Sequence, residues 1–253
     1  IMPSLVGSEM CIRDRMEGAG AEMESDMKRK TFFSTTDRRH FILQAGLGTL
    51  ALAAAGRGHA QAGPAGGARK IVILGDSLSS EYGLARGTGW AALLVQRLAE
   101  QKKTGWQVVN ASIGGDTTSG GRSRLPALLK QHRPAVLVIE LGGNDALRGL
   151  PLNMTETNLD AMVKAGLEAG AKVLLVGNQV PPNYGQRYTQ DFAALFPQIA
   201  AANRVPVVPF MLKGIADTPD AIESFQADRI HPLAKAHPLI LDNIWPELQK
   251  LIA

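Results

Sequence analysis

The chain has 253 residues, of which 45% are hydrophobic and 20% are charged, and its formal net charge is +4. These values are typical of a globular protein and allow one domain of ordinary size or at most two small ones. Basic residues gather near the N-terminus, and no later lysine/arginine run is interleaved with aromatic residues, so we expect no nucleic-acid partner. The only cysteine is Cys11, and the histidines lack ligand spacing. We therefore expect no disulfide, no metal and no other cofactor.

The first sixty residues differ in character from the rest. Residues 1–15 have no periodicity and resemble a translated sequencing adapter, so we leave them out of the fold. A basic group at 28–30, an uncharged stretch at 41–55 and a small-residue site ending at Ala62 follow in the order of an export signal. The Arg38-Arg39 pair resembles the twin-arginine signal of bacteria, although Asp37 stands directly before it.

A membrane anchor is the alternative interpretation of this region. The uncharged stretch of about 15 residues is shorter than the roughly 20 that a spanning helix needs. We therefore predict an N-terminal extension at 16–62, with a signal peptide at 27–62 that is cleaved after Ala62. The mature domain would cover residues 63–253, would keep no stable membrane anchor, and would lie in the periplasm or outside the cell.

Short apolar runs alternate with helical patterns in the mature chain. We expect strands at 71–74, 106–110, 135–141, 172–176 and 205–209, helices at 90–101, 124–131, 155–169 and 192–203, and a last helix that begins at Pro232. Strands that alternate with helices in this way predict one α/β domain with a five-stranded parallel sheet covered on both faces.

A polar pair follows the first strand. Ile71 to Leu74 are four apolar residues in a row, Gly75 ends the run, and Asp76 and Ser77 come next. The carboxyl ends of strands are where open α/β sheets place their ligands. Ser77 is therefore a candidate nucleophile if a base lies beside it, while a serine after a strand more often only caps the next helix.

Two further segments end in glycine and polar residues just past a strand. Gly114-Gly115 follows the second strand, and either supplies a turn with positive φ or brings a backbone N–H close to a ligand. Asn144 follows a glycine pair after the third strand. Its side chain either forms a local turn or is a neutral donor suited to an oxyanion.

His231 is the candidate base. It lies in a loop before Pro232, and Asp228 stands three residues earlier, near enough to turn its carboxylate onto the imidazole. An aspartate on one ring nitrogen fixes the tautomer that lets the other nitrogen accept a serine proton. The rival histidine, His237, is followed by Pro238 and is interpreted as a surface or packing residue inside the last helix.

Four segments in this order, 75–78, 114–117, 142–145 and 228–231, resemble the four blocks of the SGNH, or GDSL-type, hydrolases. The similarity spans roughly residues 71–251, and within the family it is strongest to the periplasmic thioesterase, lysophospholipase and arylesterase group. The resemblance implies a flavodoxin-like three-layer α/β/α sandwich. It also implies Ser77 as nucleophile, His231 as base and Asp228 as its orienter, with the N–H groups of Ser77 and Gly115 and the side chain of Asn144 as the oxyanion hole.

The predicted function is a secreted, monomeric serine esterase or thioesterase that acts on small acyl esters such as lysophospholipids, aryl or short-chain esters, and acyl thioesters. Seven residues near the blocks are candidates for an apolar acyl groove: Leu78, Tyr82, Ala146, Leu147, Leu150, Pro182 and Tyr184. Ordinary core or loop packing is the alternative for each of them. Two other functions stay open: a carbohydrate O-acetylesterase and a non-catalytic, flavodoxin-like lipid-binding module.

Overall fold

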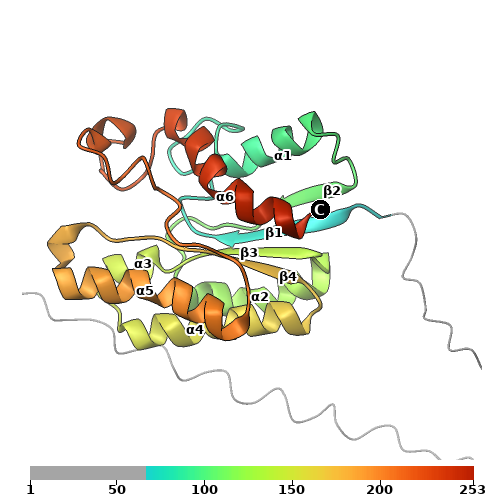
Figure 1. Cartoon of the computed structure of the whole chain (residues 1–253), viewed down its shortest axis with the longest axis horizontal. Helices are drawn as coiled ribbons and strands as arrows, with labels where there is room; N and C mark the ends of the chain where they lie inside the picture. The colour runs from blue at the N-terminus through green and yellow to red at the C-terminus, as the bar shows by residue number, and fades with distance from the viewer. Residues whose placement is uncertain (1–66) are drawn as a thin grey trace, which may run out of the picture. The chain divides into compact units, whose positions relative to one another are not determined.

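The apolar run that follows residue 70 forms the middle of the first strand, β1 (Arg69–Gly75), at the centre of a parallel sheet (Figure 1). The computed structural model describes residues 67–253. The predicted adapter tail, the N-terminal extension and the signal peptide all lie outside these residues. Within 67–253, no helix combines the length and the apolar character that a bilayer-spanning segment requires.

The other strands are β2 (Trp106–Asn110), β3 (Val136–Glu140), β4 (Lys172–Val176) and β5 (Val207–Val208). All neighbouring strands are parallel, and their order across the sheet is β2-β1-β3-β4-β5. Ile71 lies opposite Val108 on one side and Val136 on the other. This order is that of the flavodoxin-like doubly wound fold, so the predicted fold is confirmed.

Six α-helices are found in residues 67–253: α1 (Trp90–Glu100), α2 (Thr118–His132), α3 (Gly143–Leu147), α4 (Leu152–Glu168), α5 (Gln186–Asn203) and α6 (His237–Leu251). Three 3-10 turns join them: η1 (Pro182–Tyr184), η2 (Ala221–Ser224) and η3 (Ala234–Ala236). Figure 1 shows α1 and α6 on one face of the sheet and α2, α4 and α5 on the other.

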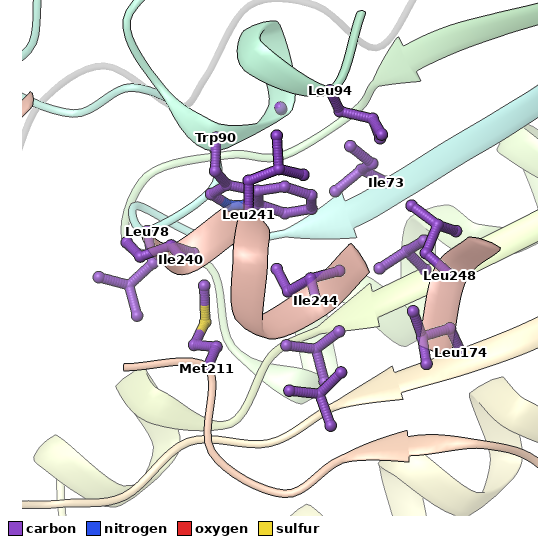
Figure 2. Packing of buried hydrophobic residues seen from close by; sticks show 14 of the residues in the cluster. Ile73, Leu78, Trp90, Leu94, Leu174, Met211, Ile240, Leu241, Ile244 and Leu248 are labelled. Atoms are coloured by element: carbon purple, nitrogen blue, oxygen red, sulfur yellow. The ribbon is translucent and has the colours of Figure 1, made fainter. Parts of the chain in front are cut away.

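Successive residues of each central strand point to opposite faces of the sheet, and both faces are buried. In β1, Ile71 and Ile73 pack in one core with α1 and α6, while Val72 and Leu74 pack in a second core with α2, α4 and α5. This explains why the strand reads as a continuous apolar run and not as an alternating one. Figure 2 shows the first core, where Trp90 lies among side chains from β1 and α6.

Three predicted helix starts are wrong. The helix expected at 192–203 begins at Gln186. The second helix begins at Thr118 and not at Arg124. The Oγ1 atom of Thr117 caps it by accepting the Gly120 N–H at 3.3 Å. The first turns contain serine, glycine and arginine, so they carry no apolar period that a sequence pattern could detect.

The last helix begins at His237 and not at Pro232. Pro232 instead pairs with Phe225 in an isolated antiparallel bridge. Two prolines compete for the first turn of this helix, and Pro238 takes that position. His237 is a packing residue and not a surface one, because it is 2% exposed and its Nδ1 accepts the Trp90 N–H at 3.0 Å.

Candidate active site

The site lies where the winding of the sheet reverses. After β1 the chain crosses to β2 at one edge of the sheet, and after β2 it returns past β1 to β3. The carboxyl ends of β1 and β3 are therefore neighbours, and the chain leaves them in different directions. Ser77 follows β1 and Asn144 follows β3. Open α/β sheets bind their ligands at this crossing point.

Three side chains form a continuous hydrogen-bonded row. The Oγ atom of Ser77 lies 2.8 Å from Nε2 of His231, and Nδ1 of the same imidazole lies 2.6 Å from Oδ2 of Asp228. The carboxylate holds the imidazole proton on Nδ1, which leaves Nε2 free to accept the hydroxyl proton. The structure thus brings together three residues that are up to 154 positions apart in the chain.

The Asp228 carboxylate is fixed by its own loop. Its Oδ1 atom accepts the backbone N–H groups of Ile230 at 2.9 Å and His231 at 3.0 Å, so Oδ2 faces the imidazole. Burial raises the pKa of this carboxyl, but hydrogen bonds from the His231 side chain and from these two N–H groups outweigh it and lower the pKa to about 2. Asp228 is therefore ionised at any pH at which the imidazole can act as a base.

Gln226 holds the histidine loop in place. Its backbone N–H donates to the His231 carbonyl at 2.8 Å, and its Nε2 atom donates to the carbonyls of Tyr82 at 3.0 Å and Pro232 at 3.2 Å. The Tyr82 ring lies on the imidazole with 4.4 Å between ring centroids. Within the loop, Arg229 adopts the left-handed conformation at φ 59°. We call the three hydrogen bonds that Gln226 makes to the carbonyls of His231, Tyr82 and Pro232 the Gln226 clasp.

The two segments that carry the other predicted donors are tied to each other. Gly115 is exposed at φ 77°, a value that favours glycine, and its carbonyl accepts Nη2 of Arg148 at 2.9 Å. Asn144 is the second residue of α3. The next residue, Asp145, is fully buried and accepts the N–H of Thr118 at 2.8 Å, which joins α3 to the start of α2.

Arg124 joins the loops after β1 and β2. Its Nε donates to Asp116 Oδ2 at 2.8 Å, and its Nη2 donates to the Gly75 carbonyl at 3.2 Å. A further bond reaches the Ala111 carbonyl. Sequence reasoning missed both Arg124 and Gln226, because each acts through backbone carbonyls of distant segments and neither lies in a glycine-bearing block.

The predicted acyl-groove residues separate into two groups. Leu78 and Ala146 are 6% and 0% exposed and belong to the two cores, so the prediction that they line a groove is wrong for both. The N–H of Leu78 donates to Asp76 Oδ1 at 3.0 Å, and its side chain lies in the core of Figure 2.

Four of the other candidates stay accessible. Tyr82 and Tyr184 are exposed, Leu147 and Leu150 are half-buried, and Pro182 begins η1. The hydroxyl of Tyr184 donates to the Leu147 carbonyl at 3.4 Å. Two exposed apolar residues were not predicted: Ile113, two positions before Gly115, and Ile230, next to His231. Their adjacency to the blocks is the signal that could have found them.

Two acidic side chains lie buried behind Ser77. Asp76 is 2% exposed and Glu140, the last residue of β3, is 1% exposed. Burial raises the pKa of Asp76 to about 6 and, together with the charge of Asp76, raises that of Glu140 well above its ordinary range. Buried acids with raised pKa values are a feature of functional sites. No three metal-ligating side chains converge anywhere in residues 67–253.

Comparison with known proteins identifies the family of this chain. The GDSL-like lipase/acylhydrolase family matches residues 73–239. The esterase TesA of Pseudomonas aeruginosa is 46% identical over 185 residues, which are 73% of this chain and 90% of that protein. The thioesterase 1/protease 1/lysophospholipase L1 of Escherichia coli K12 is 43% identical over 188 residues, which are 74% and 87%. A crystal structure of TesA has a TM-score of 0.68 at 46% identity and covers 72% of this chain and 99% of its own. The resemblance found in the sequence is thereby confirmed: the chain belongs to the GDSL-like lipase/acylhydrolase family and is a carboxylic ester hydrolase.

Proposed function

We propose that Ser77 is the nucleophile of a two-step acyl transfer. His231 takes the hydroxyl proton as Ser77 attacks the acyl carbonyl, and Asp228 stabilises the imidazolium that forms. The imidazolium then protonates the leaving group, which leaves an acyl-enzyme. Water, deprotonated by His231, attacks this ester and releases the acid. The observation that carries the proposal is the unbroken row of hydrogen bonds from the Ser77 hydroxyl to the Asp228 carboxylate, at 2.8 Å and 2.6 Å.

Three neutral donors would hold the oxyanion: the N–H groups of Ser77 and Gly115 and the Nδ2 atom of Asn144. All three lie on segments that leave neighbouring strands at the same end of the sheet. Donors that are fixed before the reaction are each worth about 3 kcal/mol in the transition state. The bond from Arg148 to the Gly115 carbonyl and the bond from Thr118 to the buried Asp145 fix two of these segments.

The substrates we propose are esters and thioesters of apolar acyl groups, among them lysophospholipids and aryl or short-chain esters. Exposed apolar side chains belong to the segments that carry the site: Tyr82 packs on the imidazole, Ile230 precedes it, and Ile113 lies in the Gly115 loop. The Ile113 N–H also bonds to the Gly75 carbonyl at 3.1 Å, directly before the Ser77 turn. Acyl chains fit such a surface, and of the two relatives one is named an esterase and the other a thioesterase and lysophospholipase.

Export of the mature domain is part of the proposal and depends on the N-terminal pattern alone. The test is expression of residues 27–253, which begin at the predicted signal peptide, in a bacterium with a twin-arginine pathway, compared with an Arg38→Lys/Arg39→Lys variant. The proposal requires periplasmic activity for the parent chain and retention in the cytoplasm for the variant. Equal periplasmic activity from both chains would remove the twin-arginine assignment and leave the esterase proposal intact.

The test of the chemistry is hydrolysis of p-nitrophenyl esters with acyl chains of 2 to about 16 carbons, followed by acyl-CoA and lysophosphatidylcholine, with protein from residue 63 onward. We expect Ser77→Ala to lower kcat by roughly 10⁴-fold or more. Ser80→Ala is the matched control, because it removes a hydroxyl three residues away that makes no side-chain hydrogen bond in the described structure. Full activity of Ser77→Ala on every substrate would overturn the proposal.

A further inference from the structure

The two oxygens of the Asp76 carboxylate have different tasks. Oδ1 accepts the backbone N–H of Leu78 at 3.0 Å, which closes the turn that holds Ser77. Oδ2 accepts Nδ2 of Asn144 at 3.0 Å. One side chain, directly before the proposed nucleophile, therefore contacts both the nucleophile's turn and the proposed side-chain donor of the oxyanion hole.

The contact with Asp76 decides which way the Asn144 amide faces. An amide group has a donor end and an acceptor end, and an ionised carboxylate can only accept. The nitrogen end must therefore face Asp76, because the reversed amide would place its carbonyl oxygen against a negative charge. One of the two Nδ2 hydrogens bonds to Asp76, and the other remains free for a substrate oxygen.

The turn at Ser77 does not by itself require a charge. A neutral asparagine at position 76 could accept the Leu78 N–H equally well, and Asx turns of this kind are common. Burying an ionised carboxylate costs free energy unless hydrogen bonds to the charged form offset that cost. The difference lies at the second oxygen: in the ionised carboxylate it accepts a hydrogen bond from Asn144, whereas an asparagine at position 76 would place an NH2 donor there.

The surroundings of Asp76 make its charge still more costly. Glu140 lies behind it, where its Oε2 atom accepts the Asp76 N–H at 3.4 Å and the Ser79 hydroxyl at 2.6 Å. Asp116 adds a second negative charge, and His231 is the positive group that opposes them when it is protonated. Burial raises the pKa of Asp76 to about 6 and the charge of Asp116 adds to the rise, while the hydrogen bonds from Leu78 and Asn144 and the charge of His231 oppose it.

We propose that Asp76 is a positioning residue, which orients the Asn144 amide so that its nitrogen faces the oxyanion. The inference rests on the proposed function, because it assigns a task within that oxyanion hole. Asp76 touches no reacting atom in this account and acts only through Asn144. An asparagine at position 76 would direct its own nitrogen at the Asn144 amide and favour the reversed orientation.

A double-mutant cycle tests the inference. Asp76→Asn, Asn144→Ala and the double variant are compared with the parent on one p-nitrophenyl ester, with kcat and KM measured separately. Loss of one oxyanion donor lowers kcat by about 10²- to 10³-fold. We expect each single variant to lose this much in kcat with little change in KM, and the double variant to be no slower than Asn144→Ala. Multiplying losses, or near-parental activity of Asp76→Asn, would overturn the inference.

The cycle also separates this inference from the proposed function. Parental activity of Asn144→Ala would remove the oxyanion role of Asn144, and both proposals about that side chain would be wrong. An impaired Asn144→Ala beside an unimpaired Asp76→Asn would remove the task of Asp76 alone.

A second measurement needs no Asp76 variant to fold. In ¹⁵N-labelled His231→Ala protein, the side-chain amide signals of Asn144 are assigned by their loss in an added Asn144→Ala change. The inference requires one of the two amide protons to shift between pH 5 and 8 with a midpoint at or above about 6, because its acceptor titrates there and this variant lacks the His231 charge that lowers the pKa of Asp76. Amide protons that stay unchanged over this range would overturn it.

Discussion

Replacement of the Asp76 carboxyl by an amide, Asp76→Asn, changes how the stability of the protein depends on pH. The side chain is 2% exposed, and burial raises its pKa from the ordinary 3.8 to about 6. Between these two values the folded protein holds a proton at Asp76 that the unfolded chain has released. The free energy of unfolding therefore falls as pH rises through this window.

The size of the effect follows from the two pKa values. Each pH unit between 3.8 and about 6 is worth about 1.4 kcal/mol, so Asp76 lowers the stability of the parent by about 3 kcal/mol between pH 4 and pH 7. An asparagine does not titrate. The free energy of unfolding of Asp76→Asn, minus that of the parent, is expected to rise by about this amount over the same range.

Urea unfolding followed by tryptophan fluorescence at pH 4, 5, 6, 7 and 8 measures this difference. The hydrogen bonds that the variant loses lower its free energy of unfolding at every pH. The informative quantity is therefore how the difference in this free energy between variant and parent changes with pH. Asp242→Asn is the control, because Asp242 is an exposed carboxylate that pairs with Arg97 and takes no part in the site. A difference between Asp76→Asn and the parent that stays constant from pH 4 to pH 8, or that falls with pH, would refute the reasoning.

Three further substitutions test other parts of the site. Gln226→Ala removes the two side-chain hydrogen bonds of the Gln226 clasp. At about 1 kcal/mol for each bond, we expect urea unfolding to show about 2 kcal/mol less stability and ester hydrolysis to show a lower kcat. An unchanged kcat would contradict the role of the clasp. Gly75→Ala places a methyl group 2.8 Å from Ser79 side-chain atoms, and we expect thermal and urea unfolding to show a loss of about 1 to 3 kcal/mol. Gly105→Ala is its control, since a methyl group there meets nothing within 4 Å, and equal stabilities of the two variants would contradict the prediction. Asp228→Asn should lower kcat by about 10⁴-fold and remove the stability that Asp228 gives above pH 3.8, which the parent loses as pH falls toward 2; acid unfolding curves that run parallel would contradict it.

The position of the site could be predicted because it depends on local patterns. An apolar run that ends in glycine marks the end of a buried strand, and the polar residues after such runs meet at one edge of a parallel sheet. This pattern marked Ser77 and Asn144 as candidates, and the roles proposed for them came from the resemblance to the SGNH hydrolases. The pair of Asp228 and His231 is three residues apart, so its contact was also within reach of sequence spacing.

The supporting contacts could not be predicted because they join segments that are far apart in the chain. Gln226 bonds to the carbonyl of Tyr82 across 144 positions, and Glu140 accepts the Ser79 hydroxyl across 61. Backbone carbonyls carry no sequence signal, so nothing in the letters marks Gln226 as their partner. The start of the last helix was misplaced for a related reason, since Pro232 and Pro238 suit a first turn equally and only packing decides between them.

The sequence also did not predict which way the side chains next to the four family blocks point. Leu78 follows the proposed nucleophile, but its N–H bonds to Asp76 and its side chain enters the core beside Trp90. Ala146 follows Asn144 by two positions and is also buried. Closeness in sequence to a block therefore did not predict exposure, because the turn geometry determines which side chains stay accessible.

The most direct test of the central claim is the site of covalent labelling by a fluorophosphonate, read by intact mass and peptide mapping. The account predicts one adduct per chain, on Ser77, with loss of labelling in Ser77→Ala. Ser79 is an internal comparison, because its hydroxyl lies 2.6 Å from Glu140 but is 1% exposed and has no histidine partner. An adduct on Ser79 or any other residue, or ester hydrolysis that continues without labelling of Ser77, would contradict the account.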